Sequence, residues 1–293
     1  MNPKTIIVTG ANSGIGYQTA LGLARQNHRV VMVCRSKERG ETAQQKIIRE
    51  TGNNQVDLIL IDLSSQQSIR DGVAEFNSRY EQLDVLINNA AIFDITQKKA
   101  QMSDDGIETI FATNHLGVFL MTNLLLPALK VSPAGRIINI ASKGLLAKPF
   151  MNIQFDNLNG EKKFNVTDAY YHSKMAQIMF TFDLAERLAD TNIATSIIRV
   201  PAVKLDEGRY DHIPAFLRAI YKFKMSFSIS TEEMAEAYIK IATSPEFAKV
   251  SGVYLDENCQ EVKASKQAHN RDTWKQLWDV SAKMTNLKQS IPV

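Results

Sequence analysis

The stretch TIIVTGANSGIGYQTALGLA, residues 5–24, combines a short apolar run, a glycine-rich turn and a helical pattern. Gly10, Gly14 and Gly16 fall within the turn. Glycine permits a tight turn and lets backbone N–H groups approach a pyrophosphate at the positive end of a helix. Such a turn alone is also compatible with a plain β-α connection. Its place at the first strand of a β-α-β unit favours dinucleotide binding.

Further apolar runs rich in β-branched residues recur along the chain. They lie at residues 29–34, 55–63, 83–89, 135–142 and 193–200, and a last short run at 252–256 is a candidate seventh strand. The runs are apolar nearly throughout, which is typical of parallel strands covered by helices on both faces. The sequence therefore predicts an α/β, doubly wound fold with a single parallel sheet of about seven strands.

Helical periodicity fills the intervals between these runs. The candidate helices lie at residues 14–27, 37–51, 66–80 and 107–126, with Ser13, Ser36, Ser65 and Ser103 as candidate N-caps. No linker rich in proline, glycine or serine divides the chain. We expect one domain over residues 1–293, comprising a cofactor-binding and catalytic core (4–200), a segment 201–229, and a last strand with a C-terminal tail (252–293).

Composition excludes several classes of protein. The net charge of +3, from 34 basic and 31 acidic residues, gives no strong nucleic-acid footprint. Cys34 and Cys259 lie far apart and lack metal-ligand spacing, which favours a reducing compartment and predicts no metal site. The N-terminal residues lack the hydrophobic region of a secretion signal, and the apolar stretch 119–130 is too short to span a bilayer. We therefore expect a cytoplasmic protein with no transmembrane segment.

The end of the second strand indicates which dinucleotide binds. An acidic residue there would bind the ribose diol of NAD and repel a 2′-phosphate. The sequence instead has Arg35, roughly 20 residues after Gly16, and no carboxylate opposes it. An arginine fork suits a phosphate, although a solvated surface arginine is the alternative. The sequence predicts NADP(H) rather than NAD(H).

A tyrosine and a lysine stand four positions apart in AYYHSKMAQ, residues 169–177. A helix puts Tyr170 and Lys174 on one face, where most such pairs are merely surface neighbours. Ser142 ends the fifth strand, and Asn114 follows the fourth. Hydride transfer to a carbonyl leaves an alkoxide that must gain a proton. A phenol can supply it only if its pKa of about 10 is lowered, and a nearby ammonium favours the phenolate.

These motifs resemble those of the short-chain dehydrogenase/reductase family. The glycine spacing T-G-x-x-x-G-x-G, the sequence NNAA at 88–91 and the Tyr170–Lys174 pair occur in the family's order. The stretches 155–180 and 250–259, and the long interval between Ser142 and Tyr170, resemble the retinol-dehydrogenase-like branch, many of whose members begin with a membrane anchor. The resemblance, which covers residues 5–256, implies a Rossmann fold.

The resemblance also implies roles for individual residues. Asn114, Ser142, Tyr170 and Lys174 would form the catalytic tetrad. Ser142 would donate a hydrogen bond to the substrate oxygen, Asn114 would hold a water that joins Lys174 to solvent, and Lys174 would bind the nicotinamide ribose. The residues expected to bind the cofactor are Gly10, Asn12, Ser13, Gly14, Ile15, Gly16, Arg35, Asp62, Leu63, Asn89, Ala90, Tyr170, Lys174, Pro201 and Val203.

Three positions depart from the family's pattern. Ala91 and Ala202 stand where the family has glycine, and Asp206 stands where it has a threonine beside the nicotinamide. Residues 212–227 mix aromatic and aliphatic side chains with basic ones. In the family this segment is a lid over the substrate, which implies an apolar carbonyl compound. Core packing and contact with an anionic membrane are the alternatives.

The sequence therefore predicts an NADP(H)-dependent oxidoreductase that interconverts an alcohol and an aldehyde or ketone, such as a carbonyl reductase, with Tyr170 as acid and base. The alternative is a non-catalytic NADP(H)-binding sensor of the same fold. An epimerase or dehydratase is disfavoured by the glycine spacing. The expected partner is a small-molecule substrate. Relatives often pair through the helices that bear Asn114 and Tyr170, so a homodimer is a further expectation.

Overall fold

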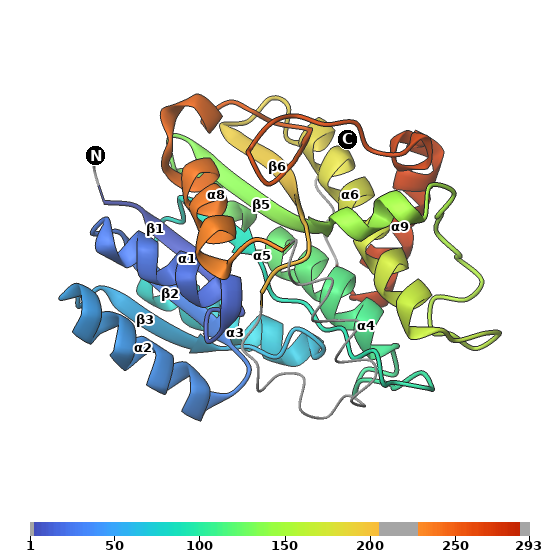
Figure 1. The fold of residues 1–293 in the computed structure, drawn as a ribbon, viewed down its shortest axis with the longest axis horizontal. Coiled ribbons are helices and arrows are strands. Elements are labelled where there is room, and N and C mark those ends of the chain that lie inside the picture. The colour runs from blue at the N-terminus through green and yellow to red at the C-terminus, as the bar shows by residue number, and fades with distance from the viewer. Residues whose placement is uncertain (1–2, 205–227, 288–293) are drawn as a thin grey trace.

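Parallel strands form the middle layer of the protein, as the sequence predicts (Figure 1). The computed structural model describes residues 3–204 and 228–287. Within them the strands are β1 (Thr5–Thr9), β2 (Arg29–Cys34), β3 (Val56–Leu60), β4 (Val85–Asn88), β5 (Gly135–Ser142), β6 (Ile193–Val200) and β7 (Val253–Leu255). The described residues thus form one seven-stranded sheet of the expected α/β class.

The strand order reverses direction at β1. The order is β3-β2-β1-β4-β5-β6-β7, so β1 pairs with β2 on one side and with β4 on the other. Val8, for example, faces Met32 in β2 and Ile87 in β4. Connections that leave on opposite faces open a crevice beyond the carboxyl end of such a strand, and ligands bind there in doubly wound sheets. The glycine-rich turn lies at this point.

Helices cover both faces of the sheet. Those described are α1 (Gly14–Arg25), α2 (Lys37–Thr51), α3 (Gln66–Arg79), α4 (Thr109–Phe111), α5 (Gly117–Val131), α6 (Val166–Arg187), α8 (Thr231–Thr243) and α9 (Arg271–Met284). Helices α1, α2 and α8 pack on one face, and α3, α5 and α6 pack on the other (Figure 1). The inner strands β1, β2, β4, β5 and β6 are therefore buried on both sides.

Helix α9 forms an additional layer outside α5 and α6. The Trp278 ring centroid lies 5.0 Å from that of Phe119 in α5 and 5.9 Å from that of Phe180 in α6. The Arg187 guanidinium lies 3.9 Å from the centre of the same indole. Cation–π and aromatic contacts of this kind add to the burial of apolar surface. The C-terminal helix is thus fixed against the helix that carries Tyr170.

Side-chain caps begin several helices, but not all as the sequence predicts. Ser36 and Ser65 each accept a hydrogen bond from the backbone N–H three residues on. Ser13 occupies the N-cap position of α1 without such a bond. Ser103 is not an N-cap, because α4 begins only after Glu108, whose carboxylate accepts the first free N–H groups. A capping carboxylate replaces the predicted hydroxyl there.

The helical stretch after β4 is longer than the apolar run suggests. Helix α4, a π-helical segment Ala112–Leu116 and α5 together form one stretch of 23 residues, Thr109–Val131. Its length and apolar composition would allow it to span a bilayer, contrary to the expectation of a run too short to do so. In the structure 89% of its most apolar window is buried inside the protein, as in a core helix.

Two buried histidines make the stability of the fold depend on pH. Burial lowers the pKa of His172 from 6.5 to about 4 and that of His115 from 6.5 to about 3. The unfolded chain therefore binds more protons than the folded one below pH 6.5, so stability falls as the pH is lowered from 6.5 towards 4. We expect His172→Gln, which keeps an acceptor for the Gln154 N–H, to flatten this dependence in thermal melts between those two values. An unchanged slope would contradict it.

Candidate active site

The glycine-rich turn brings bare main chain to the N-terminus of α1. Gly10 has a φ of +66°, which L side chains rarely adopt, and its N–H donates to the Val33 carbonyl at 2.8 Å. A Cβ on Gly16 would lie 2.3 Å from the Gly10 carbonyl oxygen, so only a hydrogen fits. Gly16 therefore lets the start of α1 pack closely against the turn that follows β1. This close approach fits the pyrophosphate of a dinucleotide.

A cavity of about 320 Å³ lies against this turn. Eleven of the residues expected to bind the cofactor line it: Gly10, Asn12, Ser13, Gly14, Ile15, Gly16, Arg35, Asp62, Leu63, Asn89 and Ala90. The other four do not line the cavity: Tyr170, Lys174, Pro201 and Val203. The structure therefore brings the residues expected around the adenosine and pyrophosphate together in one cavity, which ends at Ile92 and Thr113.

Arg39, which is not among the residues expected from the sequence, also lines this cavity. Helix α2 begins just after Arg35, and a residue four positions on lies over the same side of a helix start. The signal was present in the sequence as the spacing of the two arginines. Within the described parts of the chain neither guanidinium has an ion-pair partner, and the only carboxylate that lines the cavity is that of Asp62. Two exposed cations thus face the rim of the cleft.

The NNAA sequence ties the end of β4 to the end of β1. The Asn89 side-chain amide donates to the Thr9 carbonyl at 2.8 Å, and the Ala90 N–H donates to the Thr9 hydroxyl at 2.8 Å. These bonds hold the two strand ends on either side of the crevice. Ala91, the departure from the family's glycine, lines the cavity at an exposed position, so its methyl group is accommodated.

Tyr170 and Lys174 share one face near the start of α6. The Lys174 ammonium lies 5.8 Å from the centre of the Tyr170 ring and donates to the Ile140 carbonyl at 2.9 Å. Burial of the ammonium lowers the pKa of Lys174 from 10.5 to about 8, so the group is still mostly protonated at pH 7. The Tyr170 ring packs on Phe93, with centroids 4.5 Å apart, and meets Tyr171 edge-on at 5.4 Å.

Asn114 lies in the π-helical segment, a geometry that recurs at functional sites. Its side-chain oxygen accepts from the Ile92 N–H at 2.8 Å. Its amide group donates to the Ile92 carbonyl at 3.0 Å and to the Ser173 hydroxyl at 3.2 Å. The side chain therefore joins the segment after β4 to the helix that bears Tyr170. A water held at Asn114 stays a prediction.

Ser142 ends β5, where the chain leaves the sheet. Its hydroxyl oxygen accepts a hydrogen bond from the Gly144 N–H at 3.2 Å, within a 3₁₀ turn over Lys143–Ala147. Because this bond uses a lone pair, the hydroxyl hydrogen is left to donate elsewhere.

The expected nicotinamide segment is described only in part. Val203 pairs with Ile229 in an isolated parallel bridge, and the Lys204 N–H donates to the Ile229 carbonyl at 2.9 Å. Asp206 and the predicted lid, residues 212–227, lie outside the described residues.

Two other hollows lie away from this cleft. One of about 430 Å³ lies behind the start of α6, on the side of His172 and away from Tyr170. Another of about 830 Å³ lies at the amino-terminal edge of the sheet, by Ile193 and Gly252. Both are larger than the cleft at the glycine turn. Function in a doubly wound sheet is nevertheless expected at the carboxyl edge, where the glycine turn and the NNAA sequence lie.

The buried Lys174 ammonium makes a pH-dependent contribution to stability. Its pKa of about 8 in the folded protein lies below the ordinary 10.5, so the unfolded chain binds more protons between these values. The folded state therefore gains stability as the pH rises from 8 to 10.5. Without cofactor, we expect the melting temperature of the unaltered protein to rise relative to that of Lys174→Met between pH 7 and pH 10. Parallel curves for the two proteins would disprove this.

Comparisons with known proteins agree with the geometry. Residues 4–209 match the family described as short chain dehydrogenase. Human retinol dehydrogenase 14 is 38% identical over 98% of this chain and 88% of its own. Retinol dehydrogenase 12 of Bos taurus is 36% identical over 97% of this chain and 87% of its own. A solved structure of an uncharacterised protein of Mycobacterium paratuberculosis has a TM-score of 0.71 at 26% identity, covering 99% of this chain and 97% of that one.

These relatives correct the expected location. The sequence predicts a cytoplasmic protein, but the relatives are retinol dehydrogenases, which belong to the membrane-associated branch described above. The expectation of a cytoplasmic enzyme is therefore wrong.

The fold, the family match over most of the chain and the relatives over nearly all of it agree. The protein is an oxidoreductase that acts on an alcohol or carbonyl group and uses a nicotinamide dinucleotide. The chain belongs to the short-chain dehydrogenase/reductase family and, within it, to the retinol-dehydrogenase-like branch.

Proposed function

We propose that the protein is an NADP(H)-dependent enzyme that interconverts an apolar alcohol and its aldehyde or ketone, with Tyr170 as the acid and base. The observation that carries this proposal is the buried Lys174 ammonium, 5.8 Å from the centre of the Tyr170 ring on the same helix face. A cation so close to a phenol in a partly dry site stabilises the phenolate. It therefore lets the phenol give and regain a proton.

The chain's own residues manage the proton and the substrate oxygen. A bound dihydronicotinamide supplies the hydride to the carbonyl carbon. Tyr170 donates its phenolic proton to the substrate oxygen as negative charge develops there, and takes a proton back in the oxidation direction. Ser142 donates its hydroxyl hydrogen to the same oxygen, since its own oxygen is held by Gly144. Asn114 joins the segment after β4 to α6 through its bonds to Ile92 and to Ser173.

The two arginines at the rim of the cleft support NADP(H) over NAD(H). Arg35 and Arg39 line the cavity beyond the end of β2, where the adenosine ribose lies in such folds. Each guanidinium can give charge-assisted hydrogen bonds to a 2′-phosphate. No glutamate or aspartate among the described residues occupies the position that would bind a ribose diol at the end of β2. NAD(H) has no 2′-phosphate, so it could bind at the same site only without these hydrogen bonds to the two arginines.

Exposed apolar side chains support an apolar substrate. Phe93, which stacks on Tyr170, is 41% exposed, and Ile95 beside it is 45% exposed. Such groups near a reactive phenol would bury the hydrocarbon part of a substrate. We also propose that the chain forms a single domain.

Helix α9 bears on the proposed homodimer. Pairing through the helices that carry Asn114 and Tyr170 would need the outer face of α5 and α6. Trp278 of α9 covers part of that face by packing on Phe119 and Phe180. A homodimer through this face would therefore have to include α9 in its interface or displace it.

A panel of compounds tests the function directly. Purified protein is given NADPH with aldehydes, ketones and retinal, and the loss of the dihydronicotinamide absorbance is followed. We expect saturable oxidation of NADPH with long-chain or isoprenoid carbonyl compounds and much slower turnover with small polar ones. The alternative, a cofactor-binding sensor, predicts saturable NADPH binding without oxidation by any compound, and that result would reject the proposed enzyme.

A further inference from the structure

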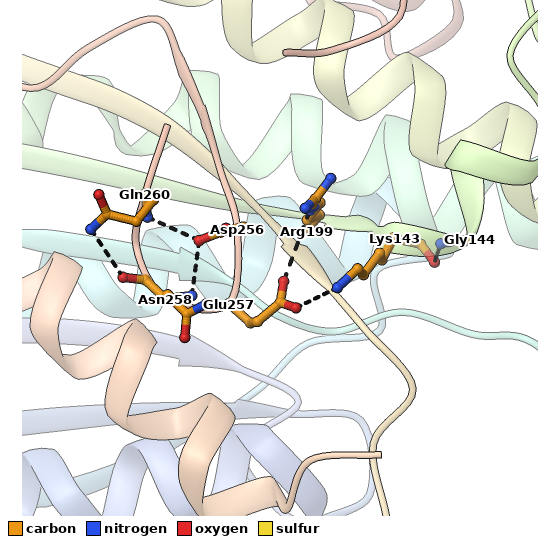
Figure 2. Close-up of polar contacts among 8 residues, drawn as sticks. Lys143, Gly144, Arg199, Asp256, Glu257, Asn258 and Gln260 are labelled. Atoms are coloured by element: carbon orange, nitrogen blue, oxygen red, sulfur yellow. Dashed lines mark hydrogen bonds and ion pairs between the residues drawn. The ribbon is translucent and has the colours of Figure 1, made fainter. Parts of the chain in front are cut away.

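A half-buried ionic cluster joins the carboxyl ends of β5, β6 and β7. Glu257 follows β7, and its carboxylate lies between Lys143, which follows β5, and Arg199, the penultimate residue of β6 (Figure 2). The Lys143 ammonium contacts one carboxylate oxygen, and the Arg199 Nε lies 3.9 Å from the other. No role in the reaction proposed above has been given to any of these three side chains.

Two of the three side chains in the cluster are largely withdrawn from water. The side chains of Arg199 and Glu257 are 13% and 19% exposed, and that of Lys143 is 38% exposed. Burial alone would raise the pKa of the Glu257 carboxyl, but the hydrogen bond and charge of Lys143 and the charge of Arg199 outweigh it and lower that pKa. Removing charges from water is costly, so a buried cluster gives little net stability. Its value is better sought in the geometry that it fixes.

A tight turn holds Glu257 in place. The Asp256 carboxylate accepts the N–H groups of Asn258 at 2.9 Å and of Gln260 at 3.0 Å, as Figure 2 shows. The Cys259 N–H donates to the Asp256 carbonyl at 2.9 Å. These bonds close the turn around the residue before Glu257. The carboxylate that meets Lys143 is therefore presented from a rigid base.

The hydrogen-bonded pairing of β5 with β6 does not extend to Lys143, the residue that follows Ser142. The β5–β6 register ends with Ser142 opposite Val200, and Lys143 is the first residue beyond it. Gly144, one residue further, donates the backbone hydrogen bond that orients the Ser142 hydroxyl. On its other side Gly144 is covered by Tyr171, since a Cβ there would lie 2.2 Å from the phenol oxygen. The contact from Lys143 to Glu257 is thus the tether of this turn towards β7.

We propose that Glu257 is a positioning residue for the reaction: it holds Lys143, and through it the turn whose backbone orients the Ser142 hydroxyl towards the substrate oxygen. The Arg199 guanidinium lies on the other side of the carboxylate and attracts it by charge, at an Nε–oxygen distance of 3.9 Å. This proposal rests on the role of Ser142 in the proposed function. It adds to the active site a residue more than a hundred positions away in sequence from the serine that it serves.

Two substitutions remove the tether from its two ends. Glu257→Gln keeps the shape of the acid but not its charge, and Lys143→Met keeps the length of the lysine stem but not the ammonium. Lys143→Arg is the matched control, because it retains a cation for Glu257. Turnover is measured with an active carbonyl substrate, per mole of NADPH-binding sites, so that unfolded protein does not count. The NADPH dissociation constant and the melting temperature are measured on the same samples.

We expect each of the first two substitutions to lower kcat about 10- to 100-fold, since a small misplacement of a reacting group costs that much. The carbonyl KM and the NADPH dissociation constant should change far less, and Lys143→Arg should restore most of the rate. The double variant should be no slower than the slower single one, because both remove one interaction. Should Glu257→Gln not fold, Lys143→Met and its arginine control decide the matter alone.

The opposite results are distinct from a failure of the proposed function. Wild-type kcat in Lys143→Met, or a fall in melting temperature without a fall in kcat, would show that the cluster is only structural and would overturn the proposal. Additive losses in the double variant would also overturn it. Tyr170→Phe is run beside them. If that variant is inactive while the tether variants are normal, the enzyme stands and only the role of Glu257 falls.

Discussion

Tyr170→Phe is expected to lower kcat about 1000-fold or more while leaving the dissociation constant of NADPH nearly unchanged. The change removes the only group proposed to give the substrate oxygen its proton but keeps the ring that packs on Phe93. Stopped-flow or steady-state turnover with an active carbonyl compound measures the first quantity, and fluorescence titration with NADPH measures the second. The result should be a protein that binds its cofactor and does not use it.

Tyr171 provides the matched control. It is the adjacent phenol, and its ring meets that of Tyr170 edge-on. Tyr171→Phe removes a hydroxyl of the same chemistry one position along, so it should cost far less turnover than Tyr170→Phe. Equal losses in the two variants, or normal turnover in Tyr170→Phe, would show that the acid has been wrongly assigned.

Arg35→Asp should reverse the preference between the two cofactors. A guanidinium paired with a phosphate contributes more than a neutral hydrogen bond, and an aspartate in its place repels the phosphate and can bind a ribose diol. We expect kcat/KM for NADPH to fall about 100-fold or more, since each 1.4 kcal/mol is a factor of ten. The same ratio for NADH should stay level or rise. Initial rates with each cofactor at a fixed carbonyl concentration measure both.

Arg39→Ala distinguishes the contribution of Arg39 to NADPH binding from that of Arg35. It removes the second cation at the rim without adding a negative charge, so we expect about a tenfold loss with NADPH and little change with NADH. The double change Arg35→Asp with Arg39→Ala should favour NADH most strongly. If Arg35→Asp leaves the ratio of kcat/KM for NADPH to kcat/KM for NADH unchanged, the enzyme does not recognise the 2′-phosphate at this position.

Local features of the chain made the fold predictable from sequence. Parallel strands buried on both faces are apolar throughout, so the seven runs are visible without an alignment. The glycine turn is visible because close backbone contact, as at Gly16, admits no other residue. Helix starts that depend on one capping side chain were less predictable. Ser103 was predicted as an N-cap, but Glu108 caps the helix instead.

Parts of the site depend on contacts between residues far apart in the chain, which spacing does not reveal. Asn114 bonds to Ile92, and Glu257 meets Lys143 across three strands. Arg39 is different, since its spacing from Arg35 at a helix start was a usable signal. The cytoplasmic location was predicted wrongly because the fold of a protein does not determine its cell compartment. The retinol dehydrogenase relatives overturn the cytoplasmic expectation, which local patterns in one sequence do not test.

The position of α9 also has a consequence for how the protein is made. This helix follows every strand of the sheet in sequence, so on the ribosome it emerges last among the described elements. Until then Phe119 and Phe180, which are shielded from water in the finished protein, have no indole to cover them. Nascent chains should therefore expose an aggregation-prone aromatic surface at a late stage of synthesis, and chaperones would bind it then. Strains limited in chaperone capacity should accordingly accumulate aggregates of this enzyme before soluble product.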